Sequence, residues 1–80
     1  MERNEVVEIC NQFVVKLGVS NYVMAKSAIF DPTLNAWRIK MVKRLNKKAV
    51  LGYVTVCNQN GDILNVTVGV TDYINRRLGR

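Results

Sequence analysis

The chain contains no histidine. Histidine is the side chain that most often serves as a general base in enzymes and as a metal ligand, so its absence excludes histidine-dependent triads and most zinc sites. The two cysteines are too few for a four-thiolate centre, the five glycines are isolated, and no two of the six acidic side chains are spaced as an acid–base pair. We therefore expect a protein that is not an enzyme and that carries no cofactor or metal.

Long apolar runs are missing as well, and we expect no targeting signal. No uninterrupted apolar stretch exceeds about five residues, whereas a helix that crosses a bilayer needs about 20. The first five residues include Glu2 and Glu5, although a secretory signal begins with basic residues. We expect a cytoplasmic protein with no membrane association, in which Cys10 and Cys57 are free thiols because the compartment is reducing.

What the sequence does contain is an excess of positive charge in its second half. The chain has 80 residues, 12 Lys and Arg side chains and six Asp and Glu side chains, which give a formal net charge of +6. Residues 1–36 have a net charge of −1 and residues 37–80 one of +7. Such an asymmetry is typical of proteins with an anionic partner, although charge also serves solubility alone. The candidate anion-binding or partner-binding residues are Arg38, Lys40, Lys43, Arg44, Lys47, Lys48, Tyr53, Arg76 and Arg77.

The first segment with a clear period is a helix. Apolar residues recur at steps of three and four between Val6 and Leu17, which predicts a helix over residues 4–17. Gly18 follows directly and can take the left-handed conformation that ends helices. Because the polar face of this helix is thin, we expect it to pack on a sheet.

Strands follow in the middle of the chain. Trp37, Ile39 and Met41 alternate with basic residues, the period of two that marks a half-buried strand. The polar stretch 46–48 predicts a break. Residues 50–57 form the next expected strand, and Trp37 is expected in the core because it shares its phase with Ile39 and Met41.

Residues 22–30 alternate cleanly in neither phase. A strand is favoured there over a helix, because Asp31-Pro32 forces a turn and the next segment is extended. This segment would be a fourth strand, first in chain order.

The register of the last hairpin depends on its turn. Asn60-Gly61 suggests a two-residue turn, but a three-residue loop over 59–61 with Gly61 left-handed separates apolar from polar side chains more completely. This loop joins residues 50–57 to a last strand over residues 63–70. The expected pairs are Val56 with Leu64, Val54 with Val66 and Gly52 with Val68.

A short final helix is expected over residues 71–78, with Thr71 as its N-cap and with Ile74 and Leu78 as its anchors. The predicted fold class is α+β, in a single domain over residues 1–80. An N-terminal helix packs on an antiparallel three- to four-stranded meander sheet, and a short C-terminal helix follows. The outer face of the sheet is expected to carry Arg38, Lys40, Tyr53, Thr55, Asn65 and Thr67.

This outer face and the basic hairpin leave several kinds of partner open. A basic strand and hairpin over residues 38–48 suit a nucleic acid, whose phosphates meet cations and whose bases stack on aromatic rings. Platforms of that kind present two or three aromatic rings, however, and only Tyr53 is expected on this face. An open sheet face or edge strand also allows a homodimer. A steep loss of affinity with salt would distinguish a nucleic-acid binder.

Short motifs follow one another along the chain. They are Gly18-Val19-Ser20, Trp37-Arg38-Ile39-Lys40-Met41, Val50-Leu51-Gly52-Tyr53-Val54-Thr55-Val56, Asn60-Gly61-Asp62-Ile63-Leu64, and Tyr73 with Arg76-Arg77. In this order they resemble the gas vesicle accessory protein O family, although the tryptophan-led strand is basic here and tends to carry glutamates in that family. The resemblance implies partners among the structural and accessory proteins of the vesicle shell.

The same order of a tryptophan strand, a second strand, an Asn-Gly turn and a further strand is also similar to PepSY-type domains. Those domains accompany secreted peptidases and inhibit or chaperone them. Both resemblances imply a non-catalytic protein-interaction or assembly module, which is the function we expect. The alternatives are a nucleic-acid-binding domain that uses residues 38–48 and a PepSY-like inhibitory or chaperone domain.

Overall fold

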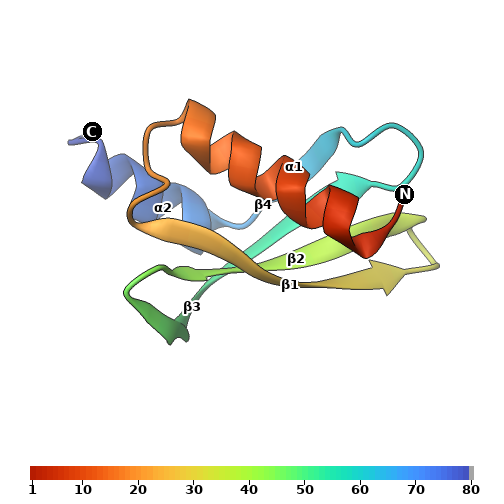
Figure 1. Ribbon diagram of the computed structural model, residues 1–80, viewed down its shortest axis with the longest axis horizontal. Coiled ribbons are helices and arrows are strands. Elements are labelled where there is room, and N and C mark those ends of the chain that lie inside the picture. The colour runs from red at the N-terminus through yellow and green to blue at the C-terminus, as the bar shows by residue number, and fades with distance from the viewer. Residues whose placement is uncertain (80) are drawn as a thin grey trace.

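The computed structural model describes residues 1–79, which form an α+β fold (Figure 1). Within these residues a four-stranded sheet in the order β1-β2-β3-β4 has antiparallel neighbours throughout, and two helices contribute to the core on one of its faces. In chain order the elements are α1 (Arg3–Lys16), β1 (Val23–Asp31), β2 (Ala36–Lys43), β3 (Asn46–Cys57), β4 (Ile63–Val66) and α2 (Val68–Arg77). The expected fold class is confirmed, with four strands in the sheet.

Helix α1 follows its apolar spacing. The backbone N–H of Glu2 donates to Oε1 of Glu5 over 2.9 Å, which satisfies a donor at the start of the helix. Beyond the helix the chain turns through Gly18, whose φ of 78° lies in the left-handed region that the prediction assigned to it. The buried residues of α1 are Val6, Cys10 and Val14.

The ambiguous segment 22–30 is strand β1, as favoured, and a bulge explains its irregular alternation. The register with β2 shifts between Ala25 and Ser27, so that Lys26 has no partner. Because of the shift, the residues that face the core are odd-numbered before the bulge and even-numbered after it, so that both Ala25 and Ala28 are buried. A period of two therefore cannot be followed through this strand.

The break expected at residues 46–48 is wrong, because β3 already begins at Asn46. This residue pairs with Lys43 across a two-residue turn. The residues that follow bulge away before the ladder with β2 resumes, and Lys47 and Lys48 are exposed. Polar side chains are tolerated in this part of the strand because they point into solvent.

The strand expected over residues 63–70 is also wrong in its second half, because β4 ends at Val66. Thr67, and not Thr71, is the N-cap of the final helix. The backbone N–H of Thr67 donates to the carbonyl of Tyr53 over 3.0 Å, and its Oγ1 accepts from the Tyr53 N–H over 3.0 Å. The Thr67 hydroxyl oxygen thus accepts the hydrogen bond from Tyr53 that a backbone carbonyl of a continuing strand would accept. The chain can therefore leave the sheet at this residue.

Helix α2 therefore starts at Val68 and continues along the first half of β3. The expected pair of Gly52 with Val68 does not form, and the Val68 side chain is 73% exposed. Val70 and Ile74 are buried, and Leu78 packs against the core as expected of an anchor. The helix is longer than predicted because it begins three residues earlier.

The register of the last hairpin is confirmed at the end away from its turn and differs next to the turn. The expected Val54–Val66 pair forms, and the turn glycine has a left-handed φ of 77°. Val56 pairs with Ile63 instead of Leu64, because the ladder shifts after Thr55. Leu64 is in consequence 58% exposed.

The core lies between the two helices and the inner face of the sheet, and Trp37 belongs to it as predicted. On the outer face Lys40 pairs with Tyr53 and Arg38 with Thr55, and Asn65 lies next to Thr55 on β4. Thr67 is not on this face as a strand residue, since it caps α2. Neither of the helices in residues 1–79 is long and apolar enough to cross a membrane.

Candidate anion-binding site

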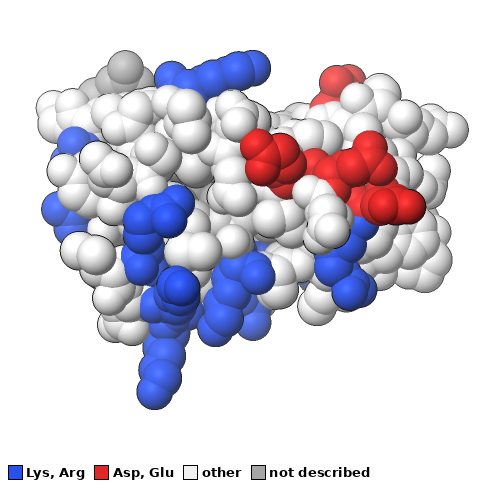
Figure 2. All heavy atoms as spheres, in the orientation of Figure 1, with Lys and Arg blue, Asp and Glu red and all other residues white. Residues whose placement is uncertain are grey.

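Charge is separated across the molecule. In Figure 2, acidic side chains gather on the side where α1 begins, whereas most basic side chains of this view lie over the β2–β3 hairpin and toward α2. The six cations of the hairpin tip and of the last turn of α2 are called the basic end below. They are Lys43, Arg44, Lys47, Lys48, Arg76 and Arg77.

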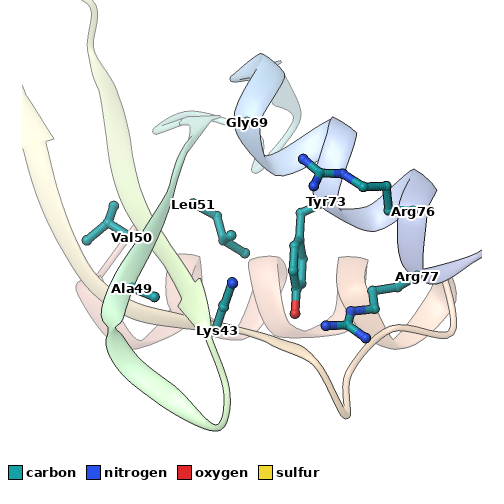
Figure 3. Close-up of a pocket in the computed structure, with 8 residues that line it drawn as sticks. All are labelled: Lys43, Ala49, Val50, Leu51, Gly69, Tyr73, Arg76 and Arg77. Carbon is teal, nitrogen blue, oxygen red and sulfur yellow. The ribbon is translucent and has the colours of Figure 1, made fainter.

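A pocket of about 490 Å³ opens within the basic end, between the β2–β3 hairpin and α2 (Figure 3). Three of its lining side chains are cations, and none of the described residues that line it is acidic. Its wall is apolar. The lining residues are Lys43, Ala49, Val50, Leu51, Gly69, Tyr73, Arg76 and Arg77.

Tyr73 organises two of these cations. The Nζ of Lys43 lies 5.1 Å from the centre of the Tyr73 ring, and the Cζ of Arg77 lies 5.0 Å from it. Figure 3 shows the two side chains on either side of the ring. Arg77 also lies 5.0 Å from the ring centre of Tyr22. Cations are attracted to aromatic faces at such distances, so both side chains are held in place without a carboxylate.

The cations of the pocket come from two distant parts of the chain, β2 and α2. Lys43 is the last residue of β2, whereas Arg76 and Arg77 follow Tyr73 by three and four positions, which places all three on one side of α2. Gly69 lets the helix approach β3, because a Cβ at this position would lie 2.4 Å from the carbonyl oxygen of Leu51. The pocket is therefore a product of tertiary packing.

The other predicted site residues lie outside this pocket. Arg44 donates from Nε to the carbonyl of Ser20. The side chains of Lys47 and Lys48 are exposed on the hairpin. Arg38, Lys40 and Tyr53 form a separate group on the outer face of the sheet, where the Cζ of Arg38 lies 5.0 Å from the Tyr53 ring centre.

The sequence prediction missed Tyr73 and Tyr22 as members of the site. Tyr73 appeared only as part of a motif in a family resemblance, although its spacing of three and four from two arginines on a helix is a usable signal. Tyr22 has no such signal, since it meets Arg77 only through the fold.

Neither cysteine lines the pocket. Residues 1–79 hold no group of three or more His, Cys, Asp or Glu side chains that could bind a metal ion. Burial raises the pKa of the Cys10 thiol to about 12, so this group is a protonated thiol at neutral pH. Cys57 is half-buried, and both cysteines are free. What the pocket can do chemically is attract and hold an anion.

Comparison of the chain with protein-family models, with curated proteins and with solved structures found no match. The resemblances to gas vesicle accessory protein O and to PepSY-type domains stay predictions from sequence.

Proposed function

We propose that this protein is a non-catalytic protein-interaction module that binds an acidic segment of a partner protein through its basic end. The observation that carries the proposal is the convergence of Lys43, Arg76 and Arg77 on one pocket whose described lining contains no carboxylate. Cations that are not neutralised internally create a local positive potential, which attracts and orients anionic partners.

The aromatic rings of the site favour an acidic protein over a nucleic acid. Bases of single-stranded nucleic acid stack on open aromatic faces. Tyr73 has a cation over each side of its ring, and Tyr22 and Tyr53 each have an arginine over theirs. These rings serve to position charge, and on Tyr73 the two cations leave little of the ring surface for a base.

Nucleic acid is the second candidate, because the positive surface extends beyond the pocket. Lys47 and Lys48 continue it along the exposed hairpin, and Arg38 and Lys40 extend it over the outer face of the sheet. A row of this kind suits the phosphates of a nucleic-acid backbone, which are bound mainly through charge.

The resemblance to gas vesicle accessory protein O would place the acidic segment on a structural or accessory protein of the vesicle shell. A PepSY-like function would place it on a peptidase. Self-association through the outer face or the β1 edge is a further proposal for the same fold, and a doubled mass in sedimentation would support it.

The test is fluorescence anisotropy with two labelled probes of equal charge, an oligoglutamate peptide and a single-stranded oligonucleotide. The double variant Lys43→Glu with Arg77→Glu should weaken peptide binding at least tenfold. The matched control is Arg3→Glu with Lys16→Glu on α1, which changes the net charge equally and should leave the affinity within about twofold. If both double variants lose the same affinity, only net charge matters and the proposed site is wrong.

The oligonucleotide decides between the two candidates. We expect it to bind more weakly than the peptide at about 200 mM salt, where weak phosphate contacts are largely lost. Tighter binding of the oligonucleotide at this salt concentration would support the nucleic-acid alternative instead.

A further inference from the structure

We infer that the pocket between the β2–β3 hairpin and α2 binds a phosphate monoester group, in the form of a phosphorylated serine or threonine on the partner's acidic segment. The inference rests on the proposed function and names the chemical group that the pocket selects. The cations that line the pocket would contact the phosphate oxygens, and because Lys43 and Arg77 lie on opposite sides of the Tyr73 ring, they would not meet the same oxygen.

The charge of the pocket matches a phosphate better than a carboxylate. A phosphate monoester carries a charge of about −1.5 to −2 at neutral pH and presents three strong acceptor oxygens. Two guanidinium groups and one ammonium group line the pocket, and they supply donors for more than one oxygen. A guanidinium binds phosphate in a bidentate manner, and arginine clusters are a recurring means of recognising phosphorylated segments.

Two of the three cations of the pocket lie against aromatic rings in the free protein. Lys43 and Arg77 lie against Tyr73, and Arg77 also lies against Tyr22. Arg76 points from α2 toward the space beside Tyr73 (Figure 3). Long side chains that are held before binding lose less conformational freedom when the anion arrives.

The size of the pocket leaves room for the group that carries the phosphate. A volume of about 490 Å³ falls within the range of sites that hold whole small ligands. Leu51 points from β3 toward Tyr73 and gives this part of the wall an apolar surface (Figure 3), which suits the carbon atoms of a serine or threonine side chain. A mononucleotide fits less well, because the Tyr73 ring has cations on both sides and offers no open face to a base.

The first experiment is a titration of the isotope-labelled chain, followed by ¹H–¹⁵N NMR, at constant ionic strength. The probes are O-phosphoserine, inorganic phosphate, 5′-AMP and acetate. We expect saturable shifts at the amides of Lys43, Gly69, Arg76 and Arg77, with O-phosphoserine at least tenfold tighter than acetate. Affinity should rise from about pH 5 to about pH 7, as the phosphate loses its second proton near pH 6.

Two charge-matched variants test the location. Arg76→Gln should weaken O-phosphoserine binding at least fivefold, whereas Lys48→Gln, which removes one exposed cation outside the pocket, should change it less than twofold. Both side chains are exposed, so neither variant threatens the fold. Equal losses in the two variants would overturn the inference.

The other probes separate this inference from the proposed function. If acetate binds as tightly as O-phosphoserine, the pocket does not select phosphate, and the inference fails even where the oligoglutamate peptide still binds to the basic end. If neither phosphate nor oligoglutamate binds, the proposed function fails as well. Binding of 5′-AMP at least tenfold tighter than O-phosphoserine would overturn the phosphopeptide assignment in favour of a nucleotide.

Discussion

The indole N–H of Trp37 donates a hydrogen bond to the side-chain oxygen of Asn58 over 2.9 Å. The same oxygen accepts from the N-terminal amine of Met1 over 3.1 Å, and the side-chain nitrogen of Asn58 donates to Oδ1 of Asn35 over 3.1 Å. Asn58 directly follows β3, and Asn35 lies in the turn between β1 and β2. One asparagine therefore joins the core tryptophan, the chain terminus and the first hairpin turn.

Replacing Asn58 with alanine should lower the free energy of unfolding by roughly 1–3 kcal/mol, because it leaves the N–H of a buried indole without an acceptor. Asn58→Asp keeps an acceptor oxygen beside both Trp37 and the amine of Met1. Its free energy of unfolding should therefore fall by less than half of the decrease in the alanine variant. Urea denaturation followed by the fluorescence of the single tryptophan measures both values. Equal losses would show that the acceptor is not what stabilises this region.

Gly69→Ala provides a test of how closely α2 packs on β3. Alanine favours a helix by about 1 kcal/mol over glycine at an unconstrained position, so propensity alone predicts stabilisation. The added Cβ would lie 2.4 Å from the carbonyl oxygen of Leu51, a backbone atom that cannot rotate away. We expect the clash to outweigh propensity and to destabilise the fold by roughly 1–3 kcal/mol. Thermal unfolding measures the sign, and a raised melting temperature would show that the close approach is not required.

Much of the fold could be predicted from the sequence because burial imposes periods on apolar residues. The step of three and four in α1 and the alternation around Trp37 both follow from one-sided packing against the core. The bulge at Lys26 breaks this relation, since one unpaired residue reverses the phase of the strand. The strand at residues 22–30 is accordingly predicted from the turn and the extended segment that follow it, and not from its own pattern.

The change from strand to helix at Thr67 could not be predicted in the same way. The valine-rich stretch 63–70 favours a strand by local propensity. What ends the strand is a contact with a distant residue, the pair of hydrogen bonds between Thr67 and Tyr53. The tertiary contact overrides the local preference here.

The sequence predicts which types of residue form the candidate site, but it does not predict which of them lie together. The excess of basic residues after position 37 is visible in the sequence and indicates an anionic partner. Lys43 and Arg77 are brought together only when α2 packs beside the hairpin, and sequence spacing carries no record of that contact. The contact of Arg38 with Tyr53 on the outer face is different, because it follows from strand register: Arg38 pairs with Thr55, two residues along β3 from Tyr53.

Cys10 and Cys57 should differ strongly in reactivity. Only the thiolate reacts with an electrophile, and burial raises the pKa of Cys10 to about 12, so at pH 8 its thiol is almost entirely protonated as well as inaccessible. Treatment of the folded chain with a thiol reagent should modify Cys57 and spare Cys10 until urea unfolds the protein. In a Cys57→Ser variant no fast reaction should remain, and rapid labelling of that variant would contradict the buried position of Cys10.

The same shift makes stability depend on alkaline pH. The pKa of Cys10 is raised in the folded state above its ordinary value of 9.0, so the folded chain holds this proton more tightly than the unfolded chain does. Its contribution to stability is complete below about pH 9 and is lost as the pH rises toward about pH 12. Urea denaturation of the wild type and of Cys10→Ala over this range should show a steeper decline for the wild type. Parallel declines would indicate that other groups cause the alkaline loss.

Tyr73 should stabilise the basic end through the faces of its ring and not through its hydroxyl. Each contact of a cation with an exposed aromatic ring contributes about 0.5–1 kcal/mol, so Tyr73→Leu, which releases Lys43 and Arg77 together, should lower the free energy of unfolding by roughly 1–2 kcal/mol. Tyr73→Phe keeps the ring and should stay within about 0.5 kcal/mol of the wild type. The leucine variant should also bind the oligoglutamate peptide more weakly, because Lys43 and Arg77 lose their contact with this ring and Arg77 keeps the one with Tyr22. If the phenylalanine variant behaves like the leucine variant in both urea denaturation and anisotropy, the hydroxyl is the group that matters. The claim that the faces of the ring position Lys43 and Arg77 would then be wrong.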